Sequence, residues 1–221
     1  MGWGEFAAAY FSFLLSHTLP IRPPLRPWLV ARLGQAGFSL AYSTLSIVVL
    51  GWLIFAAARA PYVSLWPWAS WQNYVPLVVM LPVCLIIGLA VGRPNPFSFG
   101  GAHNCSFDPA RPDIVRLTRH PLLLALALWA AAHLVPNGNL AHVILFGTFA
   151  VFALLGGRLV DARKRREMGA AWQMLCNAVS QAPLFPRSIS GAVALRLAAG
   201  SALYFGLIWL HPVFFGVSPL P

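Results

Sequence analysis

Long apolar runs, separated by short polar or Pro- and Gly-containing segments, occupy most of this chain. Each run approaches the roughly 20 residues that a helix needs to cross a bilayer; they cover residues 3–19, 38–58, 75–92, 121–136, 140–160 and 191–209. Backbone groups inside lipid have no water to bond, so such runs fold as helices and not as open strands. The pattern predicts an all-α, polytopic transmembrane helical bundle of about six spans.

The fourth and fifth runs have well-marked boundaries. Pro121 opens the fourth run, and proline is tolerated at the first position of a helix. The sequence Pro136-Asn137-Gly138-Asn139 is a turn signal that leads into the fifth run. These two runs are therefore expected to form an antiparallel hairpin. The fourth run is the shortest, and a partly re-entrant segment stays open for it.

Two further segments have helical periodicity. Residues 168–181 place Trp172, Cys176 and Val179 opposite polar side chains. This spacing indicates either an amphipathic helix in the membrane interface or an ordinary connecting helix. In the last run, small residues follow one another at helical spacing and predict a seam for close helix contact, formed by Ala198, Ala202 and Gly206.

The distribution of cationic residues predicts the orientation. Of the 15 Lys and Arg residues, all but Arg59 lie in or beside three segments on one side of the predicted bundle, at 22–32, 93–119 and 158–196. The positive-inside rule places these segments in the cytoplasm and both termini outside. We expect a multi-pass protein of a bacterial inner membrane with periplasmic termini.

The composition supports a lipid environment. Hydrophobic residues make up 59% of the chain and charged residues only 9%, whereas a soluble domain has about 25% charged residues. The net charge is +10, but the cations flank apolar runs and form no aromatic-interleaved basic domain, which argues against a nucleic-acid partner. A lipid bilayer with an anionic surface is the expected partner. One domain over residues 1–221 fits the length.

The histidines are the most informative polar residues, because ionisable groups at membrane depth are costly and often functional. His17 ends the first run and His120 begins the fourth, both near the predicted cytoplasmic face, while His133 lies near the outer turn. His120 and His133 are thirteen residues apart on one helix, so they differ in depth by roughly 20 Å and cannot hold one haem. The predicted topology therefore favours His17 with His120, and interfacial hydrogen bonding is the simpler alternative for each ring.

Thr118-Arg119-His120-Pro121 is the sharpest local feature. Arg119 presents a planar fork suited to a carboxylate, a haem propionate or a phosphate, or it serves topology and headgroup contact. Asp161, near Arg163, is either a buried pair or, as we favour, part of a solvated helix end. No nucleophile–base constellation, Gly-rich phosphate loop or paired carboxylates stand out.

Over almost its full length the chain resembles the NnrU family of bacterial membrane proteins. The motifs that carry the resemblance are residues 13–17 with Arg26, Asn95-Pro96, residues 117–121, Trp129, His133, residues 137–140, Phe146-Gly147, residues 161–163, His211-Pro212 and residues 216–219. The family is named after a protein linked to nitrite and nitric oxide metabolism. It also includes the 15-cis-ζ-carotene isomerases, integral membrane enzymes that use haem b.

The resemblance implies a haem b cofactor, an apolar small-molecule substrate, and functional roles for His17, His120 and His133, which match functional histidines of the isomerases. It pairs His17 with His133, against the depth argument above. The isomerases also have a cysteine one turn before the third histidine, proposed as an alternative iron ligand, where this chain has Ala130.

Three functions follow as hypotheses. The first is haem b-dependent isomerisation of an apolar polyene or a related haem-dependent role, and the second is a non-enzymatic membrane factor that supports nitrite and nitric oxide metabolism. The third is an S-adenosylmethionine-dependent membrane methyltransferase, because such enzymes also have Arg-His-Pro at the start of a span. They follow it with a pair of glutamates, where this chain has Asp161-Ala162.

Overall fold

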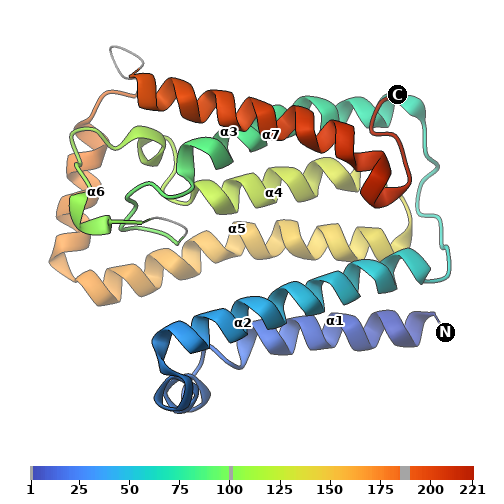
Figure 1. The fold of residues 1–221 in the computed structure, drawn as a ribbon, viewed down its shortest axis with the longest axis horizontal. Coiled ribbons are helices and arrows are strands. Elements are labelled where there is room, and N and C mark those ends of the chain that lie inside the picture. The colour runs from blue at the N-terminus through green and yellow to red at the C-terminus, as the bar shows by residue number, and fades with distance from the viewer. Residues whose placement is uncertain (1, 100–101, 185–189) are drawn as a thin grey trace. The chain divides into compact units, whose positions relative to one another are not determined.

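The computed structural model describes residues 2–99, 102–184 and 190–221, and within them the chain is helical. Its helices are α1 (Trp3–Thr18), α2 (Leu25–Arg59), α3 (Tyr74–Ala90), α4 (Pro121–Leu134), α5 (Leu140–Met168), α6 (Ala170–Gln181) and α7 (Gly191–Phe215), with the short 3₁₀ helices η1 (Ser70–Asn73), η2 (Asn104–Ser106) and η3 (Asp113–Arg116) (Figure 1). An isolated bridge between Ser64 and Asn139 is the extent of β pairing in these ranges. The predicted all-α class is confirmed.

Each predicted apolar run coincides with a helix. Four helical segments have the length and apolar composition to cross a membrane: α2, Ser70–Ala90, α5 and α7. The shorter α1 and α4 contain 16 and 14 residues, which at 1.5 Å per residue gives about 24 Å and 21 Å. Both lengths are less than the roughly 30 Å hydrocarbon core, so the predicted number of six spans is approximate.

Helix α2 begins well before the apolar run that predicted it. At Gly34 the backbone has φ 70° and ψ 167°, outside the helical region, and this kink separates the first turns from the apolar part. Glycine adopts such a left-handed φ without the steric cost of a Cβ. The first part contains Arg26 and Arg32, so part of the predicted cationic loop is a short helix. Within it, the Arg32 guanidinium lies 5.5 Å from the centre of the Trp28 ring.

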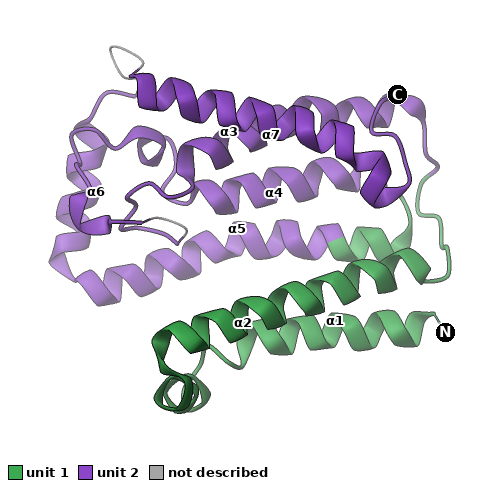
Figure 2. Ribbon diagram, in the orientation of Figure 1, with its two compact units in different colours: residues 1–66, 138–145 green, residues 67–137, 146–221 purple. Residues whose placement is uncertain are grey.

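The chain forms two compact units, coloured separately in Figure 2. The first comprises Met1–Trp66 with Gly138–Leu145, and in it α1 packs against α2. The second comprises Pro67–Asn137 with Phe146–Pro221, and in it α3 packs against both α4 and α7. The expectation of one domain over residues 1–221 stays a prediction.

The contact between α3 and α7 depends on two glycines. A Cβ at Gly200 would lie 2.7 Å from the carbonyl oxygen of Cys84, and a Cβ at Gly88 would lie 2.6 Å from that of Arg196. Real Cβ atoms do not come so close to backbone oxygen, so only glycine permits this approach. Beside it, Arg196 Nη1 donates to the carbonyl oxygens of Gly88 and Val91 at 3.1 and 2.8 Å, which caps the end of α3.

The seam predicted on α7 is wrong. A Cβ at Gly206 would meet nothing within 4 Å, and Ala198 and Ala202 are exposed. The apolar face of α7 carries small residues on more than one stripe, and the stripe that contains Gly200 is the one that meets α3.

Helix α6 has the predicted amphipathic pattern. Its Trp172 and Val179 are buried in a cluster with Ala90, Phe97 and Val115, which come from the end of α3 and the segment that follows it. Figure 1 shows α6 lying across the end of the longer helices of the second unit. The helix therefore packs against the chain that leads into α4, and contact with a membrane interface stays a prediction.

Candidate functional site

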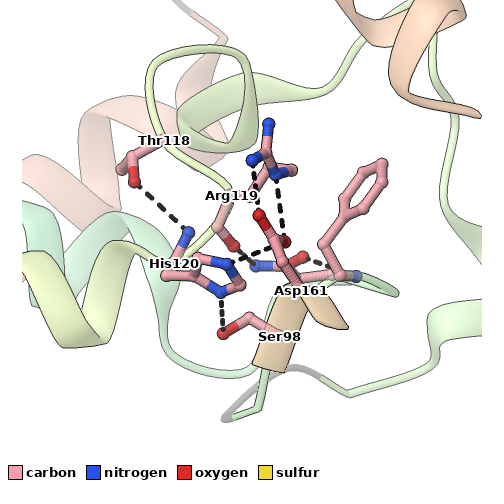
Figure 3. A network of polar contacts seen from close by, with 7 residues as sticks. Ser98, Thr118, Arg119, His120 and Asp161 are labelled. Atoms are coloured by element: carbon pink, nitrogen blue, oxygen red, sulfur yellow. Dashed lines mark hydrogen bonds and ion pairs between the residues drawn. The ribbon is translucent and has the colours of Figure 1, made fainter. Parts of the chain in front are cut away.

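A polar network joins the start of α4 to α5. The two ring nitrogens of His120 each have a partner: Nδ1 lies 3.0 Å from Ser98 Oγ, and Nε2 lies 3.0 Å from Asp161 Oδ1 (Figure 3). Asp161 also accepts two hydrogen bonds from Arg119, from Nε at 3.2 Å and from Nη2 at 2.5 Å. One carboxylate therefore bridges the arginine and the histidine of the Arg-His-Pro sequence.

Local geometry fixes the His120 ring. His120 precedes Pro121, which is the first residue of α4. The backbone N–H of His120 donates to Thr118 Oγ1 at 3.2 Å. On α5, a Cβ at Gly157 would lie 3.2 Å from His120 Cδ2. Gly157 therefore makes room for the ring, and Asp161, one turn further along the same helix, lies on the same face.

The loop after α3 holds the network from the other side. Asn95 Nδ2 donates to the carbonyl oxygen of Arg119 at 3.0 Å, and Asn95 Oδ1 accepts from the Phe97 N–H at 3.1 Å. The Asn95 N–H donates to Asn104 Oδ1 at 2.8 Å. Asn95 and Ser98 are both buried, and buried polar groups with partners fix a single arrangement of a loop.

Arg119 is held by charge and by an aromatic ring. Its guanidinium lies 5.7 Å from the centre of the Trp172 ring, and Arg165 lies 4.6 Å from the same ring. The hydrogen bonds to Asp161 raise the pKa of the Arg119 guanidinium above its ordinary value. Asp161 accepts from Nε and Nη2 of Arg119. Of the partners considered for this guanidinium, the structure therefore shows a carboxylate, and it comes from the chain itself.

The preferred interpretation of Asp161 is wrong. Its side chain is 17% exposed and bonded to Arg119 and His120, so it is not part of a solvated helix end. Arg163, the predicted pairing partner, contacts Glu167 instead, at 3.5 Å. In a helix, residues two apart point in different directions, whereas residues four apart share a face.

His133 lies near the other end of α4 in aromatic surroundings. Its Nδ1 lies 2.8 Å from the carbonyl oxygen of Trp129. A carbonyl oxygen only accepts, so Nδ1 carries the proton and Nε2 of the neutral ring has a free lone pair. The ring centre lies 5.3 Å from that of Trp129 and 5.5 Å from that of Phe146.

His17 has the same local arrangement in the first unit. Its Nδ1 lies 2.9 Å from the carbonyl oxygen of Phe13, four residues earlier, which again places the proton on Nδ1 and the lone pair on Nε2. The ring centre lies 4.1 Å from that of Phe13 and 6.2 Å from that of Tyr42. His17 belongs to one unit and His120 and His133 to the other, so the pairing of His17 stays a prediction.

The three candidate histidines differ in their capacity to bind iron. His17 and His133 each present Nε2, as metal-binding histidines do when the other nitrogen bonds to a carbonyl. His120 has both nitrogens in hydrogen bonds. No group of three or more His, Cys, Asp or Glu side chains gathers as a metal-ion site in the described part of the chain. A haem needs only one or two axial ligands from the protein, so His17 and His133 fit this cofactor.

Ser98 is a member of the network that the sequence did not reveal. It is 22 residues from His120, in a loop with no regular periodicity. The nearest signal was the adjacent Asn95-Pro96, a turn-forming pair whose asparagine side chain binds the backbone of Arg119.

Comparison with known proteins gives one match. The family model described as NnrU protein matches residues 5–219, which include the three candidate histidines, Arg119 and Asp161. No curated protein and no solved structure matches the chain.

Proposed function

Since the chain belongs to the NnrU family, we propose that it is a membrane protein that binds haem b and that His17 and His133 each present Nε2 as an axial ligand. The observation that carries the proposal is that the two histidine rings have the same tautomer and the same kind of hydrogen bond. Each ring donates Nδ1–H to the carbonyl oxygen four residues earlier in its own helix. Such a bond fixes the tautomer and orientation of a metal-binding histidine and raises the basicity of the other nitrogen.

The surroundings of His133 support a flat, apolar ligand. Trp129 packs edge-on against Phe146, with ring centres 5.3 Å apart, and lies 6.0 Å from Phe149. Aromatic side chains form large apolar surfaces that exclude water, and ligand pockets lined in this way favour apolar molecules. This environment suits both the haem macrocycle and an apolar substrate such as a polyene.

His120 has a different role in this proposal. Its ring is bonded to Ser98 and Asp161, so it positions the loop after α3 and the start of α4. When bound, haem would supply an iron centre that acts as a Lewis acid on a double bond or takes part in a related haem-dependent step. The residues of this chain would hold the haem, orient it and exclude water.

Activity on ζ-carotene itself is expected to be weak or absent. Ala130, three residues before His133, is fully buried and has no thiol to offer, where the related isomerases have the cysteine proposed as an alternative ligand. The substrate is therefore proposed to be a different apolar molecule, or the protein serves nitrite and nitric oxide metabolism without turnover.

An absorption spectrum of the detergent-purified protein tests the proposal. The protein is produced in cells that make haem, and the expected result is a Soret band with the α and β bands of a b-type haem after reduction. A spectrum without haem, together with saturable binding of S-adenosylmethionine, would replace this proposal with the methyltransferase function.

A further inference from the structure

The second unit contains a pocket that the haem proposal does not use. It has a volume of about 330 Å³ and lies between the segment leading into α4 and the facing side of α6. Its polar lining consists of Arg116, Thr118, Arg119, His120, Cys176 and Ser180. Pockets of this size are typical of small-ligand sites.

The charged side chains that line the pocket are both arginines. Arg116 and Arg119 both line it, and none of its lining residues is Asp or Glu. The Nε–H of Arg116 donates to the carbonyl oxygen of Ala182 at 2.8 Å. This bond uses one of the five N–H donors of the guanidinium. Arg119 donates from Nε and Nη2 to the Asp161 carboxylate. Because Asp161 compensates one arginine, about one positive charge remains. The Thr118 hydroxyl accepts from the His120 N–H and keeps its own hydrogen to donate, whereas the Ser180 hydroxyl donates to the carbonyl oxygen of Asn177 at 2.7 Å.

The other wall of the pocket is apolar. Phe97, Leu117 and Val179 line it, and Leu117 is largely exposed. The pocket also lies at the end of the unit where α3 ends and α4 and α7 begin (Figure 1). In a membrane-spanning bundle, this end lies near the level of the lipid headgroups.

We propose that this pocket binds a phosphate group, either as the headgroup of an anionic lipid or as a free phosphate-bearing molecule. Arginine and hydroxyl donors around a confined space are the groups that bind phosphate oxygens in proteins. The volume holds a headgroup and not a whole lipid, so an acyl chain would leave along the apolar wall. The proposal is independent of haem and concerns a different part of the second unit.

Cys176 provides a reporter inside the pocket. Cys105 is exposed, Cys84 is buried and Cys176 is half-buried, so a Cys105→Ser protein leaves Cys176 as the reactive thiol. Burial raises the pKa of this thiol, and labelling is therefore measured at alkaline pH. Each rate is divided by the rate of the same reagent with a free small thiol, because the thiolate itself favours a cationic reagent. After this normalisation we expect an anionic methanethiosulfonate reagent to react roughly fivefold faster than a cationic reagent of similar size, the effect of about 1 kcal/mol of attraction at a partly hydrated site.

Competition separates the two sources of phosphate. Dioctanoyl phosphatidic acid and inorganic phosphate are each titrated against labelling of Cys176 by a neutral reagent in detergent. Protection by the lipid alone indicates a headgroup site, and protection by both at similar concentrations indicates a site for free phosphate. Equal rates for the anionic and cationic reagents, or no protection by either probe, would overturn the proposal.

Matched variants test whether the pocket itself is responsible. Arg116→Gln keeps an N–H donor for Ala182 but removes the charge, and it should lower both the reagent preference and the protection at least threefold. Arg163→Gln is the control, because Arg163 is exposed and pairs with Glu167 outside the pocket. An equal loss in both variants would show a general surface charge and contradict a built site.

A second variant keeps the test valid if Arg116→Gln does not fold. Ser180→Leu fills part of the pocket from an exposed position on α6 and leaves every charge in place. It should weaken lipid protection and retain the faster reaction with the anionic reagent. Unchanged protection in this variant would place the phosphate elsewhere.

Discussion

The bridge between α4 and α5 predicts a specific cost for removing the Asp161 charge. Asp161→Asn keeps the size of the side chain but replaces one accepting oxygen with an NH₂ group. That group would face the donors of Arg119 or His120, which now lie 2.5 to 3.2 Å from the carboxylate. Two donors pointing at each other cannot bond, so at least one contact is lost.

The magnitude follows from the exposure of the partners. A hydrogen bond to a charged group contributes about 1.5–3 kcal/mol, but the Arg119 side chain is 43% exposed and regains part of this energy from water. We expect a net loss of about 1–2 kcal/mol of unfolding free energy. At about 2–4 °C per kcal/mol for a chain of this size, the melting temperature should fall by about 2–8 °C.

Glu167→Gln is the matched control, an acid-to-amide change in the same helix. Glu167 is 51% exposed and contacts Arg163 and Lys164 at 3.5 and 3.3 Å. Exposed pairs contribute about 0–1 kcal/mol, so its melting temperature should change by at most about 4 °C. Both variants are measured by thermal unfolding in the same detergent, followed by circular dichroism at several scan rates. Equal shifts in the two variants would refute the structural role assigned to Asp161.

Three further predictions concern packing, topology and activity. Gly200→Ala should lower the melting temperature through about 1–3 kcal/mol of overpacking, whereas Gly206→Ala should leave it unchanged or raise it, since alanine is the better helix former; the opposite order would contradict the contact between α3 and α7. In intact cells, a single cysteine at position 165 should resist a membrane-impermeant thiol reagent and one at position 62 should react; labelling at 165 would reverse the predicted orientation. Haem-loaded, reduced protein in liposomes should convert 15-cis-ζ-carotene weakly or not at all, as resolved by chromatography; robust turnover that disappears in His17→Ala would show a true carotene isomerase.

The helices could be predicted because lipid imposes a simple rule on the sequence. A long apolar run must satisfy its own backbone and therefore forms a helix, and the start of α4 at Pro121 and of α5 at Leu140 were predicted to the residue. The start of α2 was not. Its first turns contain Pro27 and two arginines, Arg26 and Arg32, which interrupt the apolar run, and the left-handed Gly34 gives no signal of a kink within a longer helix.

The site depends on contacts that no local pattern encodes. Asp161 meets His120 across 41 residues, and an acidic residue in a helix rich in arginine has several nearer partners. The choice among them depends on which face of α5 packs against α4, and Gly157 and Ala153 set that face. Likewise, Gly200 and Gly206 are equivalent in sequence, and only the packing of α3 selects Gly200.

Absorption spectra of three histidine variants test the central claim most directly. His17→Ala, His120→Ala and His133→Ala are purified in the same detergent, and the Soret band of each is compared at equal protein concentration with that of the unsubstituted chain. The account predicts that His17→Ala and His133→Ala each lose or shift the band. It predicts that His120→Ala keeps the band position, because both of that ring's nitrogens are bonded to Ser98 and Asp161. An unchanged band in His17→Ala or His133→Ala, or a band lost in His120→Ala alone, would contradict it.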